Sequence, residues 1–172
     1  NILSFLKKIS FESKWQEHKT LASNCIKELT KFNIGSPCPE LIVENQNNEK
    51  ISSDDYSGSK WVIYFYPKDN TPGCTAQACS LRDGYDALRN KGIKVLGVSA
   101  DGVKSHDKFV TKYDLPFALL ADEDKSVIHE FGVWGPKKFM GREYEGIHRV
   151  SFLIDESGII THVVQKPKTK DH

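Results

Sequence analysis

Short apolar runs alternate with segments of helical periodicity through the middle of this chain. Three runs rich in branched and aromatic residues indicate buried strands at 61–66, 93–99 and 118–121. The segments that follow them favour helix, at 75–90, 102–113 and 125–131. In the first of these segments the apolar positions Ala78, Leu81, Tyr85 and Leu88 recur in steps of three and four. This alternation predicts strands that are covered by helices.

Two hairpin patterns flank this central region. Residues 41–43 and Ile51 indicate a short N-terminal hairpin. Residues 150–154 and 159–164 indicate a second hairpin around the turn at 155–158. The whole order predicts an α/β domain with a central mixed sheet flanked by helices.

The first 33 residues differ from the rest. They are rich in lysine and have helical periodicity, and the Gly-Ser-Pro sequence at 35–37 ends the pattern. We therefore expect an extra N-terminal helix, as a helical extension at 1–33, and a domain at 34–172. A helix packed on the domain is the simplest interpretation. The alternatives are the remains of a targeting extension or a helix that binds a partner.

Composition excludes several classes of protein. A chain of 172 residues fits one domain, and its net charge of +1 gives no electrostatic reason to expect nucleic acid. No apolar run approaches the ~20 residues that span a bilayer, so we expect no membrane partner. The four cysteines, at 25, 38, 74 and 79, lack the spacing of a disulfide framework and indicate intracellular thiols. The chain has no Cys-x-x-Cys, no His pair at ligand spacing and no phosphate loop, so we expect no metal and no cofactor.

The strongest candidate for chemistry is Cys74. Pro67 ends the strand at 61–66, a polar turn follows, and Cys74 then falls in the first turn of a helix. Helix N-termini have unpaired N–H groups and favour anions, so a thiol placed there ionises more easily. The alternative is a buried cysteine that acts as a small apolar residue. The proline-flanked turn favours a reactive thiol.

Several motifs resemble those of peroxiredoxins. The pattern Pro67-x-x-x-Thr71-x-x-Cys74 resembles the active-site signature of that family. The longer stretch at 64–79 is similar to the bacterioferritin-comigratory-protein or Q-type branch, as are Gly-Ile-His-Arg-Val-Ser-Phe-Leu-Ile-Asp at 146–155 and the blocks Phe-Gly-Val-Trp-Gly and Phe-Met-Gly within 131–141. The resemblance covers most of the chain after the N-terminal extension.

The resemblance implies a thioredoxin-like fold and a thiol peroxidase that reduces hydrogen peroxide or organic hydroperoxides. It implies recycling by thioredoxin or a similar dithiol, and a monomer. The family has a final helix after this hairpin, and we expect that helix to be missing here. A thiol–disulfide oxidoreductase is one alternative, although such enzymes use Cys-x-x-Cys. A holdase or redox relay that docks through the N-terminal helix is another.

The resemblance also assigns roles to individual residues. Cys74 is the nucleophile and becomes a sulfenic acid. The Thr71 hydroxyl, the N–H groups of Gly73 and Cys74, and the Arg149 guanidinium would hold the peroxide in line with the sulfur. Thr71 can also serve as the N-cap of the helix. Pro67 would shield the thiolate from water.

Cys79 is the candidate resolving cysteine. On an intact helix its Cα atom lies ~8.7 Å from that of Cys74, beyond the ~7 Å limit for a disulfide. If Cys79 resolves the sulfenic acid, the first turns of the helix must unwind in each cycle. The alternatives are that Cys79 is a core thiol, or that Cys25 or Cys38 resolves instead. His148 precedes Arg149 on the strand and is expected to be structural or exposed.

Overall fold

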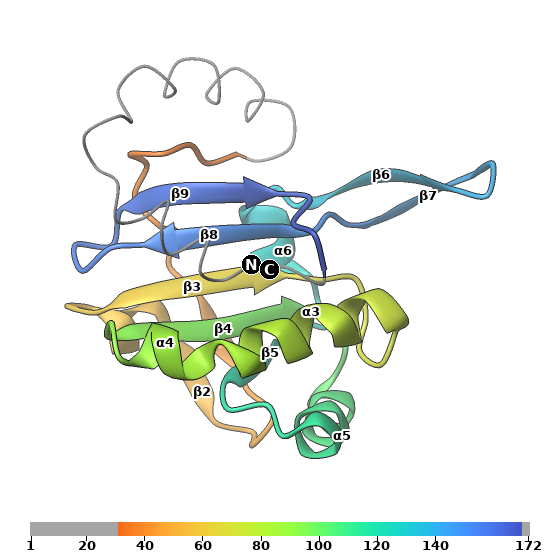
Figure 1. Cartoon of the computed structure of the whole chain (residues 1–172). Coiled ribbons are helices and arrows are strands. Elements are labelled where there is room, and N and C mark those ends of the chain that lie inside the picture. Colours follow the sequence, from red (N-terminus) through yellow and green to blue (C-terminus); the bar gives the residue numbers. More distant parts are fainter. Residues whose placement is uncertain (1–30, 170–172) are drawn as a thin grey trace.

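A five-stranded mixed sheet forms the centre of the protein (Figure 1). The computed structural model describes residues 31–169. The strand order is β5 (Ala118–Ala121), β4 (Ile93–Ser99), β3 (Lys60–Phe65), β8 (Val150–Ile154) and β9 (Ile160–Gln165). The pairs β3–β4 and β4–β5 are parallel, whereas β3–β8 and β8–β9 are antiparallel. The predicted α/β fold with a mixed sheet is confirmed.

Helices cover both faces of this sheet. The helices α3 (Pro72–Asp83), α4 (Tyr85–Arg89) and α5 (Val103–Tyr113) pack on one face. The helix α6 (Ser126–Glu130) covers the other face (Figure 1). Alternate residues of β3 therefore point into two separate apolar clusters. Because β3 is buried on both faces, its sequence after the exposed Lys60 is apolar and does not alternate.

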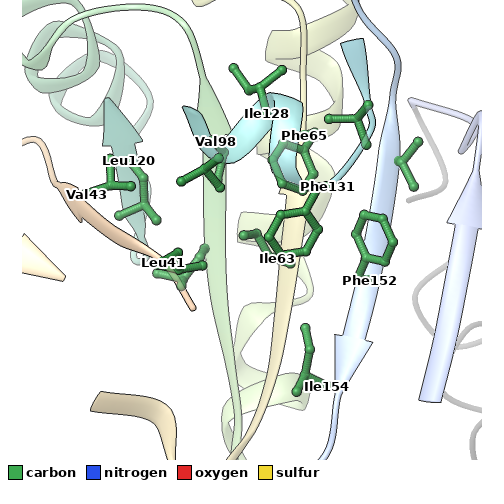
Figure 2. Packing of buried hydrophobic residues seen from close by; sticks show 14 of the residues in the cluster. Leu41, Val43, Ile63, Phe65, Val98, Leu120, Ile128, Phe131, Phe152 and Ile154 are labelled. Carbon is green, nitrogen blue, oxygen red and sulfur yellow. The ribbon is translucent and has the colours of Figure 1, made fainter. Parts of the chain in front are cut away.

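Three phenylalanines fill the centre of the face under α6 (Figure 2). The Phe131 ring lies between those of Phe65 and Phe152, with centroid distances of 4.9 and 5.1 Å. Phe65 and Phe152 meet edge to face at 6.0 Å. Tilted and edge-on rings at these distances are the favoured geometry for aromatic pairs. This cluster holds the strands β3 and β8 firmly side by side.

Two small hairpins complete the described chain. The first, β1 (Ile42–Glu44) with β2 (Lys50–Ser52), confirms the predicted N-terminal hairpin and leads into the 3-10 helix Ser53–Tyr56. The second, β6 (Trp134–Phe139) with β7 (Arg142–Ile147), was not predicted as strands. It projects beyond the end of the sheet (Figure 1). Its strands pair with each other and bury little apolar surface, so the sequence has no period-two pattern there.

The predicted helix at 75–90 was wrong in its bounds. The helix α3 begins three residues earlier, at Pro72, because proline is preorganised for the first helical position. Gly84 then ends α3 and separates it from α4, since glycine disfavours a helix interior. Apolar periodicity runs across this break and could not reveal it.

The expected N-terminal helix lies almost wholly outside the described residues. Residues 31–33 are irregular, and the Phe32 ring packs on Phe131 with centroids 5.8 Å apart. Between residues 31 and 169 no helix combines the length and apolar character needed to cross a membrane.

Candidate active site

Strand pairing brings the two halves of the candidate site together. In the antiparallel pair of β3 and β8, Phe65 lies opposite Val150. Arg149, which precedes Val150, therefore lies beside the end of β3, where the loop that contains Pro67 begins. Residues 75 positions apart in the chain meet there because the sheet fixes their register.

The loop after β3 places Cys74 in the first turn of α3. Asn70 has a left-handed backbone (φ 55°), and Thr71 has the extended conformation of an N-cap residue. The Thr75 N–H donates to the Thr71 carbonyl at 2.8 Å. Helix geometry leaves the N–H groups of the preceding residues, Gly73 and Cys74, without an intrahelical acceptor. As predicted, Cys74 therefore lies at a helix N-terminus.

The Cys74 thiol contacts the predicted arginine. Cys74 is buried, with 2% of its surface exposed, and Arg149 Nη2 donates to its Sγ at 3.0 Å. A guanidinium donor at this distance stabilises negative charge on the sulfur. The sulfur, the arginine and the helix N-terminus together favour nucleophilic attack by sulfur on an electron-poor atom, with the group bonded to that atom leaving as an anion.

Gln77 is a site residue to which the sequence analysis assigned no role. Its side chain is fully buried, and its Oε1 accepts a hydrogen bond from Arg149 Nη1. It lies three residues after Cys74, on the same face of α3. That spacing was the available signal, but it does not reveal that Arg149 approaches this face. Gln77 Nε2 is buried without a hydrogen-bond partner among residues 31–169.

Close packing explains why position 73 is glycine. A Cβ atom at Gly73 would lie 3.1 Å from Arg149 Nη2, which is closer than most real Cβ contacts. The absence of a side chain thus lets the guanidinium approach the helix N-terminus. A Cβ at the same position would lie 3.9 Å from Thr169 Cγ2, so the C-terminal segment also lies near this part of the site.

Thr71 and Pro67 lie where the motif predicts, in the loop that leads to Cys74. Thr71 is the N-cap residue of α3, as expected, but its side chain makes no capping bond: its hydroxyl donates instead to the Lys68 carbonyl at 3.1 Å. That bond tightens the loop by linking residues three apart. Both Thr71 and Pro67 are half-buried at the approach to the helix.

Cys38, Cys74 and Cys79 are free thiols. Cys79 is half-buried and lies in α3 together with Cys74, so the separation of ~8.7 Å expected on one helix applies. Burial raises the pKa of Cys38 to about 12, which disfavours the nucleophilic thiolate. Cys25 lies outside the described residues.

Two basic residues lie near Arg149. Lys137 Nζ donates to the Ile147 carbonyl at 2.9 Å; burial lowers the Lys137 pKa, and the nearby Arg149 lowers it further. The sequence analysis missed Lys137 because its hairpin was not predicted. His148 is half-buried and would lie 3.2 Å from a Cβ at Gly135. Burial, with the charges of Lys137 and Lys166, lowers the pKa of His148 and favours its neutral form.

Metal ligation has no support in the part of the chain that the structure describes. No group of three or more His, Cys, Asp or Glu side chains there is arranged to hold a metal ion.

A cysteine at a helix N-terminus on a thioredoxin-like sheet, paired with an arginine, defines a thiol-based redox enzyme. Residues 34–163 match the AhpC/TSA family, and the chain therefore belongs to that family. It is 50% identical to the putative peroxiredoxin Bcp of Haemophilus influenzae and 48% identical to peroxiredoxin Bcp of Escherichia coli K12. Each alignment covers 84% of this chain, and 93% and 92% of the relatives.

Solved structures agree with these relatives. The bacterioferritin comigratory protein of Xanthomonas campestris superposes with a TM-score of 0.71 at 34% identity. The superposition covers 75% of this chain and 82% of that protein. The predicted resemblance to the Bcp or Q-type peroxiredoxins is thus confirmed, and the enzyme is a peroxiredoxin.

Proposed function

We propose that this chain reduces hydrogen peroxide and organic hydroperoxides through Cys74. The contact of 3.0 Å between Arg149 Nη2 and Cys74 Sγ, at the start of α3, is the observation that supports it most directly. The Xanthomonas campestris protein has alkyl peroxide reduction activity. Organic hydroperoxides are therefore proposed substrates here as well.

In the first step the Cys74 thiolate attacks one peroxide oxygen. The S–O bond forms as the O–O bond breaks, which gives a sulfenic acid and an alkoxide or hydroxide that takes up a proton. Arg149 and the N–H groups of Gly73 and Cys74 are the donors for the two oxygens. The Thr71 hydroxyl can turn from the Lys68 carbonyl toward the bound peroxide.

In the second step Cys79 attacks the Cys74 sulfenic acid. The S–S bond forms, the S–O bond breaks, and water leaves. Because both cysteines lie in α3, the helix between them must unwind before their sulfurs can meet. Gln77 lies within this segment, so unwinding also removes the acceptor of Arg149 Nη1.

In the third step an external dithiol reduces the Cys74–Cys79 disulfide. Thioredoxin or a similar protein supplies two electrons by thiol–disulfide exchange, and its own two thiols are oxidised to a disulfide. This need places the cycle in an intracellular, reducing compartment. Since the nucleophile, its donors and the resolving cysteine all come from one chain, a monomer suffices for the cycle.

The experiment that tests this cycle is intact mass measurement after one equivalent of hydrogen peroxide. Wild type, Cys79→Ser and Cys38→Ser are compared, with peptide mapping. We expect wild type and Cys38→Ser to lose two hydrogens that map to Cys74 and Cys79. Cys79→Ser should instead hold an added oxygen on Cys74.

Three results would contradict parts of the proposal. If Cys74 is oxidised but wild type forms no Cys74–Cys79 disulfide, Cys79 is not the resolving thiol. If wild type forms a different disulfide from Cys74 that the Cys38→Ser variant cannot form, the resolving thiol is Cys38. A Cys74 that does not react with peroxide would refute the peroxidase assignment.

A further inference from the structure

A buried contact between a histidine and an aspartate lies behind the loop that leads to Cys74, outside the proposed chemistry. His106, on α5, is fully buried, and Asp69, in the loop, is 5% exposed. His106 Nδ1 lies 2.8 Å from Asp69 Oδ2. Burying polar or charged groups is costly unless they are paired and hydrogen-bonded, so these two side chains must keep their relative positions.

Both ring nitrogens of His106 have partners inside the fold. Nε2 lies 3.1 Å from the carbonyl oxygen of Leu120, and Nδ1 lies 2.8 Å from Asp69 Oδ2 and 3.4 Å from the Tyr66 hydroxyl. These contacts on both sides of the ring fix its orientation toward Asp69.

Asp69 is held by three separate elements. Its carboxylate accepts hydrogen bonds from the Tyr66 hydroxyl at 2.7 Å and from the Ser105 hydroxyl at 2.8 Å. Its backbone N–H donates to Asp101 Oδ2 at 2.8 Å. The end of β3, the turn after β4 and the first turn of α5 therefore all fix this one loop residue.

Asp69 is also close to the residues that hold the peroxide. After it, Asn70 turns the chain with a left-handed backbone, and Thr71 is the N-cap residue before α3. No regular structure lies between Asp69 and the helix, so the position of Asp69 sets the position of the first helical turn. That turn contacts Arg149, which precedes β8, the neighbour of β3 on the side opposite β4.

We propose that Asp69 and His106 are positioning residues for the peroxide step. They anchor the loop so that Thr71 and the first N–H groups of α3 meet the Arg149 guanidinium at the correct distance. The anchor also keeps the loop in place while the helix beyond it unwinds, so that the site can reassemble after reduction. This inference rests on the proposed peroxidase cycle.

The test compares variants of the pair with a matched buried carboxylate. Asp69→Asn and His106→Gln each disrupt the contact between the two side chains, and the double variant allows an amide–amide hydrogen bond in its place. Asp122 is the control, because it is 2% exposed and accepts instead from the N–H groups of Val127 and Ile128 in α6. Asp122→Asn thus removes the charge of a buried carboxylate that binds a different helix, α6.

Two rate constants are measured for each reduced variant, together with its stability in urea. The first is the oxidation of Cys74 by hydrogen peroxide, and the second is the later formation of the Cys74–Cys79 disulfide. We expect Asp69→Asn and His106→Gln to slow oxidation on the order of tenfold, since small misplacement of reacting groups is costly. Disulfide formation should stay within about twofold of wild type, because it does not use the peroxide donors.

The remaining variants sharpen the result. The double variant should recover part of the oxidation rate, since its two neutral side chains can pair again. Tyr66→Phe removes one hydrogen bond to Asp69 with little change of shape, and we expect roughly a threefold loss. If Asp69→Asn and His106→Gln do not fold, the Tyr66→Phe variant tests the proposal in their place.

The proposal would be overturned by equal oxidation rates in the pair variants and in Asp122→Asn at matched stability. In that case the pair only stabilises the fold. A wild type that itself fails to react with peroxide would refute the proposed function. A wild type that reacts, with pair variants that react equally fast, refutes the anchor alone.

Discussion

The two terminal nitrogens of the Arg149 guanidinium have different partners. Nη2 donates to Cys74 Sγ, and Nη1 donates to Gln77 Oε1. A planar, permanently charged fork can make both bonds at once, whereas a lysine ammonium on a flexible stem cannot keep this geometry. At the scale of one residue, the shape of the donor therefore matters as much as its charge.

Arg149→Lys should lose most peroxidase activity although it keeps the charge. We expect kcat/KM for hydrogen peroxide to fall roughly 100-fold, comparable to the loss of one preorganised donor in a tetrahedral or oxyanion site. Arg89→Lys, on the exposed surface of α4, is the matched control and should be neutral. Near-normal turnover in Arg149→Lys would show that a point charge is sufficient.

The sequence predicted the site residues that belong to a local motif better than those that depend on the fold. Cys74, Thr71 and Pro67 follow one another in the chain, and Arg149 has its own recognisable context. Gln77 has no such context, because its role exists only when Arg149 comes across from β8. The spacing of side chains along one element does not show which element lies opposite.

At the scale of the element, α3 has two demands that oppose each other. The intact helix presents Cys74 at its N-terminus and Gln77 one turn later, as peroxide capture needs. Disulfide formation needs the same turns to open, because Cys79 also lies in α3. The local stability of this helix should therefore set the rate of resolution.

Ala76→Gly should speed disulfide formation. Ala76 lies between the two cysteines, and glycine weakens a helix interior by about 1 kcal/mol, which corresponds to roughly fivefold faster opening. Rapid-quench mass spectrometry after a single addition of peroxide measures the rate. Ala87→Gly, in the neighbouring helix α4, is the matched control. Equal rates in wild type and Ala76→Gly would show that unwinding does not limit resolution.

The elements themselves differ in how well sequence could predict them. The strands β3, β4 and β5 and the helix α5 were predicted within one residue, because buried apolar side chains mark them. The hairpin of β6 and β7 was missed, since two strands that pair in solvent need no apolar face. Gly84 ends α3 without interrupting the apolar period.

At the scale of the whole molecule, two apolar clusters lie on opposite faces of one sheet. The cluster under α6 includes Phe131, and the cluster under α3 includes Cys74. Cys38 packs at the border of the first cluster, far along the chain from the chemistry. Its burial beside this cluster raises its pKa, so its ionisation links stability to pH.

Stability should fall at alkaline pH partly because of Cys38. Burial raises its pKa from 9.0 to about 12 in the folded protein, so its contribution is fully present below pH 9 and is lost as pH rises toward 12. Between pH 8 and 10 the free energy of unfolding should fall by about 1 kcal/mol more in wild type than in Cys38→Ala. Buried tyrosines such as Tyr64 and Tyr66, whose pKa values are also raised, contribute equally to both proteins.

Urea unfolding at the two pH values measures this difference. Val163→Ala, a non-titrating position beside the same cluster, is the control and should show the same pH dependence as wild type. An identical loss of stability in Cys38→Ala and wild type would show that water reaches the thiol of the folded protein.

Gln77 lies between Cys74 and Cys79 in the sequence of α3, and this has a consequence for the turnover of the enzyme in the cell. In the proposed cycle, the Cys74 sulfur of an oxidised molecule is bonded to Cys79 and Gln77 no longer orients Arg149, so that molecule cannot react with another hydroperoxide. When peroxide is abundant, oxidised and inactive enzyme therefore accumulates until a dithiol reduces it. The flux through this enzyme is then governed by the supply of reducing power and no longer by the concentration of peroxide.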